Sequence, residues 1–300
     1  MDTGILLESG TNELEVLEFK VGNNFYGINV AKIKEILPYK KPTPIPNAHP
    51  CVEGIFMPRD SVITVVDLAK CLNRPGSENE ALDMNIVTNF NKINVAFHVQ
   101  SVIGIHRISW EDIIKPDETI NAIGHSVATG IIKFNDKLII ILDFESIISD
   151  INPETGLKVS DINKMVARQR NESPILIAED SELLNHLITE CLKKAGYVNI
   201  MTTKNGLEAW EKLQEFKNNK TIQTNVKCVI TDIEMPQMDG HHLTKLIKSD
   251  NELKELPVII FSSLVNDDMR RKGEVLGVDA QLSKPEIASL VDIIDQLILS

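Results

Sequence analysis

The chain after Pro174 alternates between short apolar runs and stretches with helical periodicity, and this alternation limits its fold more than any other feature. Ile175–Ala178 is apolar throughout, as expected for a strand that is covered on both faces. Leu183, Leu187 and Cys191 then recur on one face of a predicted helix. Further apolar runs follow at 198–201, 226–230, 258–261 and 280–282, and a last helix is predicted over 286–299. Five strand–helix units predict a compact parallel α/β domain.

The first half carries a different pattern, in which short β-type runs are separated by turn residues. Gly22-Asn23-Asn24 predicts a hairpin turn, and Asn135-Asp136 predicts another. Strands are predicted at 16–21, 25–28, 61–66, 86–88, 93–99, 128–134 and 137–142, with short helices near 30–37 and 68–72. This half is therefore expected to be mainly β and barrel-like.

Polar residues from 151 to 173 break both patterns and are predicted to link two domains. A chain of 300 residues is long enough for two domains of about 150 residues. The expected division is a flexible N-terminus over 1–12, a first domain over 13–150, the linker over 151–173 and a second domain over 174–300. The linker is compatible with a short helix around 161–168.

Net charge and cysteine spacing exclude several classes of protein. The 31 Lys and Arg residues against 43 Asp and Glu residues give a net charge of −12, whereas a nucleic-acid binder needs a basic face. The 4 cysteines form no C-x-x-C pair, so reduced thiols are expected. The sequence opens without a signal-peptide pattern, and no apolar run approaches the ~18 residues of a spanning helix. We therefore expect a cytoplasmic protein with no direct membrane insertion.

Acidic, hydroxyl and amine side chains lie at or just after the ends of the predicted strands of the second domain. They are Glu179, Asp180, Asp232, Ser262 and Lys284. Parallel strands bring their carboxyl ends to one edge of the sheet, where ligands bind. Clustered carboxylates repel one another unless a hard cation such as Mg²⁺ is held between them. A site of Mg²⁺, carboxylate, lysine and hydroxyl suits phosphoryl transfer.

Each of these side chains also has an ordinary explanation when it is taken alone. Glu179-Asp180 is typical of a solvated loop, and Asp232 of a helix cap. Ser262 is typical of a strand end and Lys284 of a surface charge. Their arrival at the same sheet edge favours a functional site.

The second domain resembles the receiver domain of two-component response regulators over about residues 174–300. The resemblance rests on Glu179-Asp180, on the segments 231–240 (TDIEMPQMDG) and 257–262, and on Lys284-Pro285. It implies a flavodoxin-like (βα)5 fold in which Asp232 accepts a phosphoryl group. It also implies a cis peptide bond between Lys284 and Pro285.

The same resemblance implies a role for each residue of the strand-end cluster. The metal ligands that it implies are Glu179, Asp180, Asp232 and the backbone carbonyl of Glu234. Lys284 would pair with the phosphoryl oxygens, and Ser262 would hydrogen-bond the phosphoryl group. Gln281 stands where receivers usually carry a switch aromatic, so the output surface is expected to differ from that of a free-standing receiver.

The first domain resembles the CheW-like coupling domain of bacterial chemotaxis over about residues 13–150. The resemblance rests on 33–36 (IKEI), 43–47 (TPIPN), 54–59 (GIFMPR) and 65–68 (VVDL), and it continues through 101–105 and 130–143. It implies two small β-barrel subdomains that bridge chemoreceptor cytoplasmic tips to the histidine kinase CheA. Glu35 and Arg59 match a charged pair of that family and are expected to meet across the first barrel, near the receptor-contacting face. The alternative is a surface ion pair worth about 0–1 kcal/mol.

A coupling domain followed by a receiver resembles the architecture of the CheV chemotaxis proteins. It implies an adaptor without enzymatic turnover, located at receptor arrays beneath the inner membrane, whose phosphorylated Asp232 hydrolyses slowly. One alternative is a phosphate sink that drains CheA without interdomain signalling. Another is a haloacid-dehalogenase-like phosphatase with Asp232 as nucleophile and Glu234 as acid/base. That phosphatase family places its nucleophile after the first strand, whereas Asp232 follows the third predicted strand.

Overall fold

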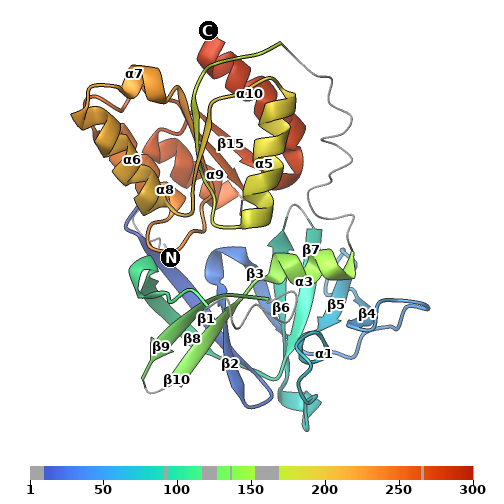
Figure 1. The fold of residues 1–300 in the computed structure, drawn as a ribbon. Helices are drawn as coiled ribbons and strands as arrows, with labels where there is room; N and C mark the ends of the chain where they lie inside the picture. Colours follow the sequence, from blue (N-terminus) through green and yellow to red (C-terminus); the bar gives the residue numbers. More distant parts are fainter. Residues whose placement is uncertain are drawn as a thin grey trace. The chain divides into compact units, whose positions relative to one another are not determined.

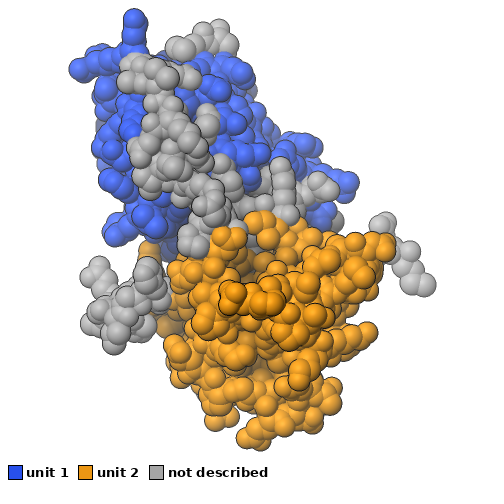
Figure 2. Space-filling model, turned by 90° about the vertical axis from the view of Figure 1, so that its right-hand side faces the viewer, with its two compact units in different colours: residues 1–13, 157–300 blue, residues 14–156 orange. Residues whose placement is uncertain are grey.

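The computed structural model describes residues 10–90, 93–116, 127–135, 137–152, 169–264 and 267–299. The chain forms two compact units (Figures 1 and 2), unit 1 with residues 1–13 and 157–300 and unit 2 with residues 14–156. The helix considered at 161–168 lies outside the described residues. None of the described helices is long and apolar enough to cross a membrane.

One sheet of unit 2 has the strand order β8-β1-β2-β10-β9. Its strands are β1 (Glu13–Val21), β2 (Asn24–Asn29), β8 (Ser101–Ser109), β9 (Ala128–Phe134) and β10 (Lys137–Leu142). Ile114, beyond β8, exchanges backbone hydrogen bonds of 2.8 and 2.9 Å with Ile131 of β9. The two edges of the sheet therefore meet, as they do in a barrel. Val16, Ile132 and Ile139 pack together in its core.

The other sheet of unit 2 has the order β3-β6-β7-β5-β4. Its strands are β3 (Ile33–Pro38), β4 (Val52–Phe56), β5 (Ile63–Asp67), β6 (Met84–Phe90) and β7 (Ile93–Val99). Thr43, beyond β3, pairs with Ile55 of β4, so these two edges meet as well. The fold confirms the mainly-β double barrel expected for the first domain.

Short helices and a shared apolar core complete unit 2. The helices are η1 (Val30–Lys32), α1 (Leu68–Cys71), η2 (Glu80–Leu82), η3 (Trp110–Asp112) and α3 (Phe144–Ile151). Phe19 of β1, Phe97 of β7 and Phe144 of α3 are buried in one cluster that draws on both sheets. The rings of Phe97 and Phe144 meet edge to face with their centroids 4.6 Å apart, a favourable aromatic geometry.

The helix predicted near 30–37 is wrong beyond its first turn. Only η1 is helical there, and 33–38 form β3, which pairs antiparallel with β6. Ile33, Ile36 and Leu37 have the spacing of a helical face. In β3, a β-bulge between Ile33 and Glu35 shifts the register, so Ile33 and Ile36 pack against one core cluster and Leu37 against another. Tertiary pairing therefore overrides the local pattern.

Unit 1 is a parallel sheet with helices on both faces, which confirms the predicted α/β fold (Figure 1). The strand order is β12-β11-β13-β14-β15, with β11 (Ile175–Ala178), β12 (Ile200–Thr203), β13 (Cys228–Thr231), β14 (Val258–Ser262) and β15 (Ala280–Ser283). The helices are α5 (Glu182–Lys194), α6 (Gly206–Asn218), α7 (Ile222–Asn225), α8 (Gly240–Ser249), α9 (Asp267–Leu276), η5 (Lys284–Glu286) and α10 (Ile287–Leu299).

The alternation of side chains along the strands explains the two layers of helices. Ile175 and Ile177 of β11 pack in a core with side chains of α5 and α10. Leu176 and Ala178 belong to the other core, with side chains of α6 and α8. Successive side chains of a strand point to opposite faces, so a strand buried on both faces is apolar throughout.

The cis bond expected between Lys284 and Pro285 stays a prediction, because the placement of the Pro285 ring is not described. Pro285 lies in the first turn of η5, where its missing N–H is not needed by the helix. The carboxylate of Glu286 accepts a hydrogen bond of 3.1 Å from the Ser283 N–H, which caps this turn.

Candidate active site

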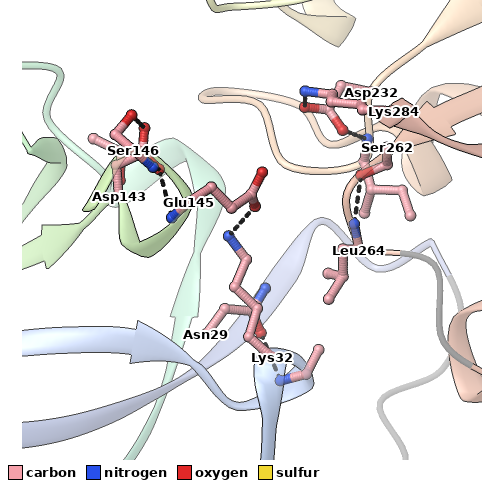
Figure 3. A network of polar contacts seen from close by, with 12 residues as sticks. Asn29, Lys32, Asp143, Glu145, Ser146, Asp232, Ser262, Leu264 and Lys284 are labelled. Atoms are coloured by element: carbon pink, nitrogen blue, oxygen red, sulfur yellow. Dashed lines mark hydrogen bonds and ion pairs between the residues drawn. The ribbon is translucent and has the colours of Figure 1, made fainter. Parts of the chain in front are cut away.

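The carboxyl ends of the parallel strands bring the sequence-predicted side chains of unit 1 to one edge of the sheet. Glu179 and Asp180 follow β11, and Asp232 follows β13. Ser262 is the last residue of β14, and Lys284 follows β15. Figure 3 shows Asp232, Ser262 and Lys284 close together at this edge. Each side chain is placed by the strand that precedes it, so the site depends on the sheet register.

Both carboxylate oxygens of Asp232 have hydrogen-bond partners in a buried setting. Asp232 is 6% exposed, its Oδ1 accepts from the Ile233 N–H at 2.6 Å, and its Oδ2 accepts from the Lys284 ammonium at 2.7 Å (Figure 3). A Cβ at Gly240 would lie 1.9 Å from the Asp232 carbonyl oxygen. Only glycine can therefore begin α8 so close to the carboxylate-bearing residue.

The Lys284 ammonium is shared between two buried carboxylates. Its Nζ lies 2.7 Å from Asp232 Oδ2 and 3.0 Å from Glu179 Oε2, and the lysine is 6% exposed. A buried ammonium of this kind is stable only when carboxylates compensate its charge. It also places a fixed positive charge beside the Asp232 oxygen.

The Glu179 carboxylate is less well compensated than that of Asp232. Its Oε1 accepts from the Ser181 N–H at 3.2 Å, but its Oε2 has no partner in hydrogen-bond geometry, although the Lys284 ammonium is near. Burial raises the pKa of Glu179 to about 8, with the charges of Asp232 and Asp180 adding to the rise and that of Lys284 opposing it. The buried oxygen is thus available to a further positive charge.

The acidic cluster fits a divalent cation in geometry, chemistry and charge. One carboxylate oxygen from each of Glu179, Asp180 and Asp232 lies within 4.8 Å of the others. Oxygen donors are the ligands that Mg²⁺ prefers. Three carboxylates against the one ammonium of Lys284 leave a formal charge of −2, which a divalent cation balances. The Oε2 of Glu179, which is ion-paired with Lys284 but accepts no hydrogen bond, gives such an ion a further ligand.

Ser262 holds the start of the loop that follows β14. Its side chain is 1% exposed, and its hydroxyl oxygen accepts from the Leu264 N–H at 3.2 Å (Figure 3). A movement of this hydroxyl toward a group on Asp232 would release the Leu264 N–H. The loop after β14 is therefore tied to the position of the hydroxyl.

Gln281, at the position of the usual switch aromatic, is bound to α9. Its Nε2 donates a hydrogen bond of 2.8 Å to the Arg270 carbonyl, within the turns of that helix. A Cβ at Gly273 would lie 2.6 Å from the Gln281 side chain, so glycine makes room for the amide. The side chain thus lies along α9 and is fixed there by a specific contact.

Glu35 and Arg59 of unit 2 meet, as expected from the sequence. Arg59 Nη2 lies 3.0 Å from Glu35 Oε2, with side-chain exposures of 76% and 20%. Glu35 belongs to β3 and Arg59 follows β4, the two edge strands of their sheet. The pair therefore lies where the edge strands β3 and β4 meet and close the barrel formed by β3–β7.

Unit 2 also contains two buried charge networks that the sequence did not predict. His98 lies between Glu53 and Asp83, and Glu18 between His106 and Lys137. The partners come from different strands, so no local spacing signals either network. The one available hint is Glu18 of β1, which stands between Leu17 and Phe19 and is buried with them.

Comparisons with known proteins match each unit to a separate family. Residues 15–152 match the CheW-like domain, and residues 175–295 match the response regulator receiver domain. Chemotaxis protein CheV3 of Helicobacter pylori is 29% identical over 300 residues, which cover 96% of this chain and 95% of that protein. Chemotaxis protein CheW of Thermotoga maritima is 30% identical over 151 residues, which cover 50% of this chain and 98% of that protein. The crystal structure of the scaffolding protein TtCheW from Thermoanaerobacter tengcongensis has 24% identity and a TM-score of 0.40, covering 43% of this chain and 83% of that one.

Proposed function

The chain belongs to the CheW-like family and joins that domain to a response regulator receiver domain, as CheV-type proteins do, and from this we propose a chemotaxis adaptor. In this proposal unit 2 couples chemoreceptor cytoplasmic tips to the histidine kinase CheA, at receptor arrays beneath the inner membrane. Unit 1 regulates the coupling through Mg²⁺-dependent phosphorylation of Asp232. The observation that carries the proposal is the buried Asp232 carboxylate beside a shared ammonium and two further carboxylates.

Transfer of the phosphoryl group to Asp232 is a simple displacement at phosphorus. The P–N bond of a CheA phosphohistidine breaks, and its electron pair returns to the imidazole nitrogen. A carboxylate oxygen of Asp232 supplies the electron pair of the new P–O bond. No proton has to leave Asp232, because the residue reacts as the carboxylate.

The residues around Asp232 have separable parts in this chemistry. Mg²⁺ held by Glu179, Asp180, Asp232 and the carbonyl of Glu234 would neutralise charge on the phosphoryl oxygens. Lys284 supplies a second positive charge at Asp232 Oδ2. In this proposal the Ser262 hydroxyl, which accepts from the Leu264 N–H, leaves that N–H and binds the phosphoryl group, which would shift the start of the loop after β14. Slow hydrolysis of the phosphoaspartate would return the unit to its starting state.

The signalling role requires a surface of unit 1 that differs between the two states. The start of the loop after β14 and the Gln281 contact with α9 are candidates for that surface, since the first is held by Ser262 and the second lies on β15, the strand that precedes Lys284. On unit 2, we assign the partner contact to the surface around Glu35 and Arg59. A phosphate sink needs neither surface. Beryllofluoride serves as a mimic of the phosphoryl group on Asp232. If it leaves kinase output unchanged in a reconstituted receptor–CheA assay, the phosphate sink is favoured.

The decisive experiment replaces Asp232 by asparagine and follows transfer of labelled phosphate from CheA. We expect Asp232→Asn to lose labelling and chelation of Mg²⁺ to abolish labelling of the unaltered chain. Asp268→Asn, an exposed aspartate of α9, is the matched control and should be labelled normally. Equal labelling of Asp232→Asn would show that the phosphoacceptor is another residue.

A further inference from the structure

Residues 10–12 lie against unit 1, far in sequence from the residues that they contact. The Asn12 side chain is 7% exposed, its Nδ2 donates to the Gln237 carbonyl at 2.8 Å, and its Oδ1 accepts from the Asp239 N–H at 3.1 Å. One amide therefore satisfies two backbone groups of the loop 233–239. The sequence places residues 1–12 in a flexible terminus, yet these buried bonds make residues 10–12 part of unit 1.

Gly10 supplies a second anchor on α8. Its carbonyl lies 2.7 Å from His242 Nδ1, which donates to it. Gly10 has a φ of +73°, and a Cβ there would lie 2.8 Å from Lys245 Cδ. Asn12 has a φ of 62°, which asparagine tolerates better than most residues. The segment thus has the residue types that its backbone path requires.

The loop that residues 10–12 hold is the one that leads away from Asp232. Its first N–H, that of Ile233, donates to Asp232 Oδ1 at 2.6 Å. Its last residue, Asp239, caps α8 by accepting from the His242 N–H at 2.7 Å. The loop is also closed on itself, because the Gly240 N–H donates to the Ile233 carbonyl at 2.9 Å. A contact at Asp239 therefore restrains the backbone that carries Ile233 and Glu234.

We propose that residues 10–12, here named the strap, position the loop 233–239 for phosphoryl transfer, with Asn12 as the positioning residue. The inference rests on the proposed phosphorylation of Asp232. Loop geometry and strap binding are thermodynamically linked, so a change at Asp232 alters strap affinity as much as the strap alters the reaction. Asn12 directly precedes Glu13, the first residue of β1, so the strap continues into that strand.

Two strap variants and two matched controls test the positioning role. Asn12→Gly removes both amide bonds without backbone strain, and Gly10→Ala places a methyl group against Lys245. The controls are Asn47→Gly, at an exposed asparagine with a φ of 58°, and Gly76→Ala, where nothing lies within 4 Å of the added Cβ. All four are made in the full chain and phosphorylated with acetyl phosphate over a series of Mg²⁺ concentrations.

The strap variants should be labelled about threefold to tenfold more slowly than the controls, the size expected for one or two lost hydrogen bonds. The Mg²⁺ concentration for half-maximal labelling should also rise, which a loss of folded protein alone would not cause. A readout without metal is amide hydrogen exchange of 233–240. The Asp239 amide should exchange faster in both strap variants and at the wild-type rate in both controls.

The outcomes separate the strap from the proposed function. Normal labelling kinetics in Asn12→Gly and Gly10→Ala would overturn the positioning role, and faster exchange with normal labelling would reduce the strap to a structural contact. Unchanged exchange would overturn the contact itself. Labelling of Asp232→Asn would instead overturn the phosphoacceptor assignment, and the exchange measurement would still report on the strap.

Discussion

The two units both bury carboxylates beside cationic side chains, but they differ in how completely the charges are paired. In unit 2, His98 Nδ1 lies 2.8 Å from Glu53 Oε1, and its Nε2 lies 2.8 Å from Asp83 Oδ2. The second Glu53 oxygen accepts from the Tyr39 hydroxyl at 3.0 Å. In unit 1, one ammonium serves two carboxylates, and Glu179 Oε2 is left without a hydrogen bond.

The second network of unit 2 is paired as fully as the first. Glu18 is completely buried, its Oε2 lies 2.7 Å from His106 Nε2, and its Oε1 accepts from the Lys137 ammonium. Burial raises the pKa of Glu18, but Lys137 and His106 outweigh it, so the pKa lies below its ordinary value. Fully paired networks hold a fold together, whereas an incomplete one retains charge that can act on a ligand.

Replacing His98 by alanine should have the largest effect on stability, because it leaves the buried Asp83 and the half-buried Glu53 without their shared cation. Removal of one partner from a buried pair costs about 3–5 kcal/mol. We expect the free energy of unfolding of unit 2 to fall by about 3 kcal/mol or more. Denaturant unfolding in a Trp210→Phe background measures it, because Trp110 then reports on unit 2 alone.

His49→Ala is the control for this variant, since His49 is an exposed histidine of the same unit. Labelling of Asp232 should be unaffected by either change. An unfolding midpoint of His98→Ala equal to that of His49→Ala would mean that the network contributes nothing to stability.

Replacing Lys284 by methionine should have its main effect on phosphoryl transfer. The variant removes the fixed positive charge at Asp232 Oδ2, and loss of one such preorganised group slows reactions by about 100-fold. The initial rate of labelling from phosphorylated CheA measures this. Lys212→Met, which removes an ammonium paired with exposed Glu215 on α6, should leave the rate unchanged. A wild-type rate for Lys284→Met would place the ammonium outside the reaction.

The titration of His98 should make the stability of unit 2 depend on pH. Burial lowers the pKa of His98, but hydrogen bonds and charges from Glu53 and Asp83 outweigh burial, so the pKa lies above 6.5. A raised folded-state pKa gives stabilisation that is complete below 6.5 and is lost as pH rises through the folded-state value. We therefore expect the Trp110 unfolding midpoint to fall with rising pH above 6.5, and His98→Gln to weaken this trend. A steeper fall in His98→Gln would contradict the assignment.

The Glu35–Arg59 pair should show the smallest effect on stability. Its arginine is 76% exposed, and exposed pairs contribute about 0–1 kcal/mol. Glu35→Gln should therefore leave the unfolding midpoint of unit 2 within about 1 kcal/mol of the wild type. Binding to CheA and to receptor fragments should nevertheless weaken if this surface contacts a partner. Unchanged binding to both would restrict the pair to closing the β3–β7 barrel.

The parallel sheet and its cluster of polar side chains could be predicted from the sequence because both follow from local order. The central strands β11, β13 and β14 are apolar runs, broken only by a hydroxyl residue at the end of β13 and of β14, and their carboxyl ends meet at a common edge. Asp232 and Lys284 could thus be placed together although they are 52 positions apart.

Features that depend on partners distant in sequence could not be predicted. The apolar residues of 33–38 have helical spacing, and this segment forms a strand because it pairs with β6. The Glu18 network joins residues 88 and 119 positions apart, and no motif records such a separation.

The contact between Asn12 and Gln237 joins positions 225 residues apart. This separation has a consequence for the recombination of domains between such proteins. A recombination that replaces everything after residue 169 would carry the parallel sheet and its carboxylates intact. It would leave Gly10 and Asn12 with the old chain, facing a loop to which they are not matched. The transferable unit is therefore discontinuous, and a functional hybrid needs both of its pieces from one parent.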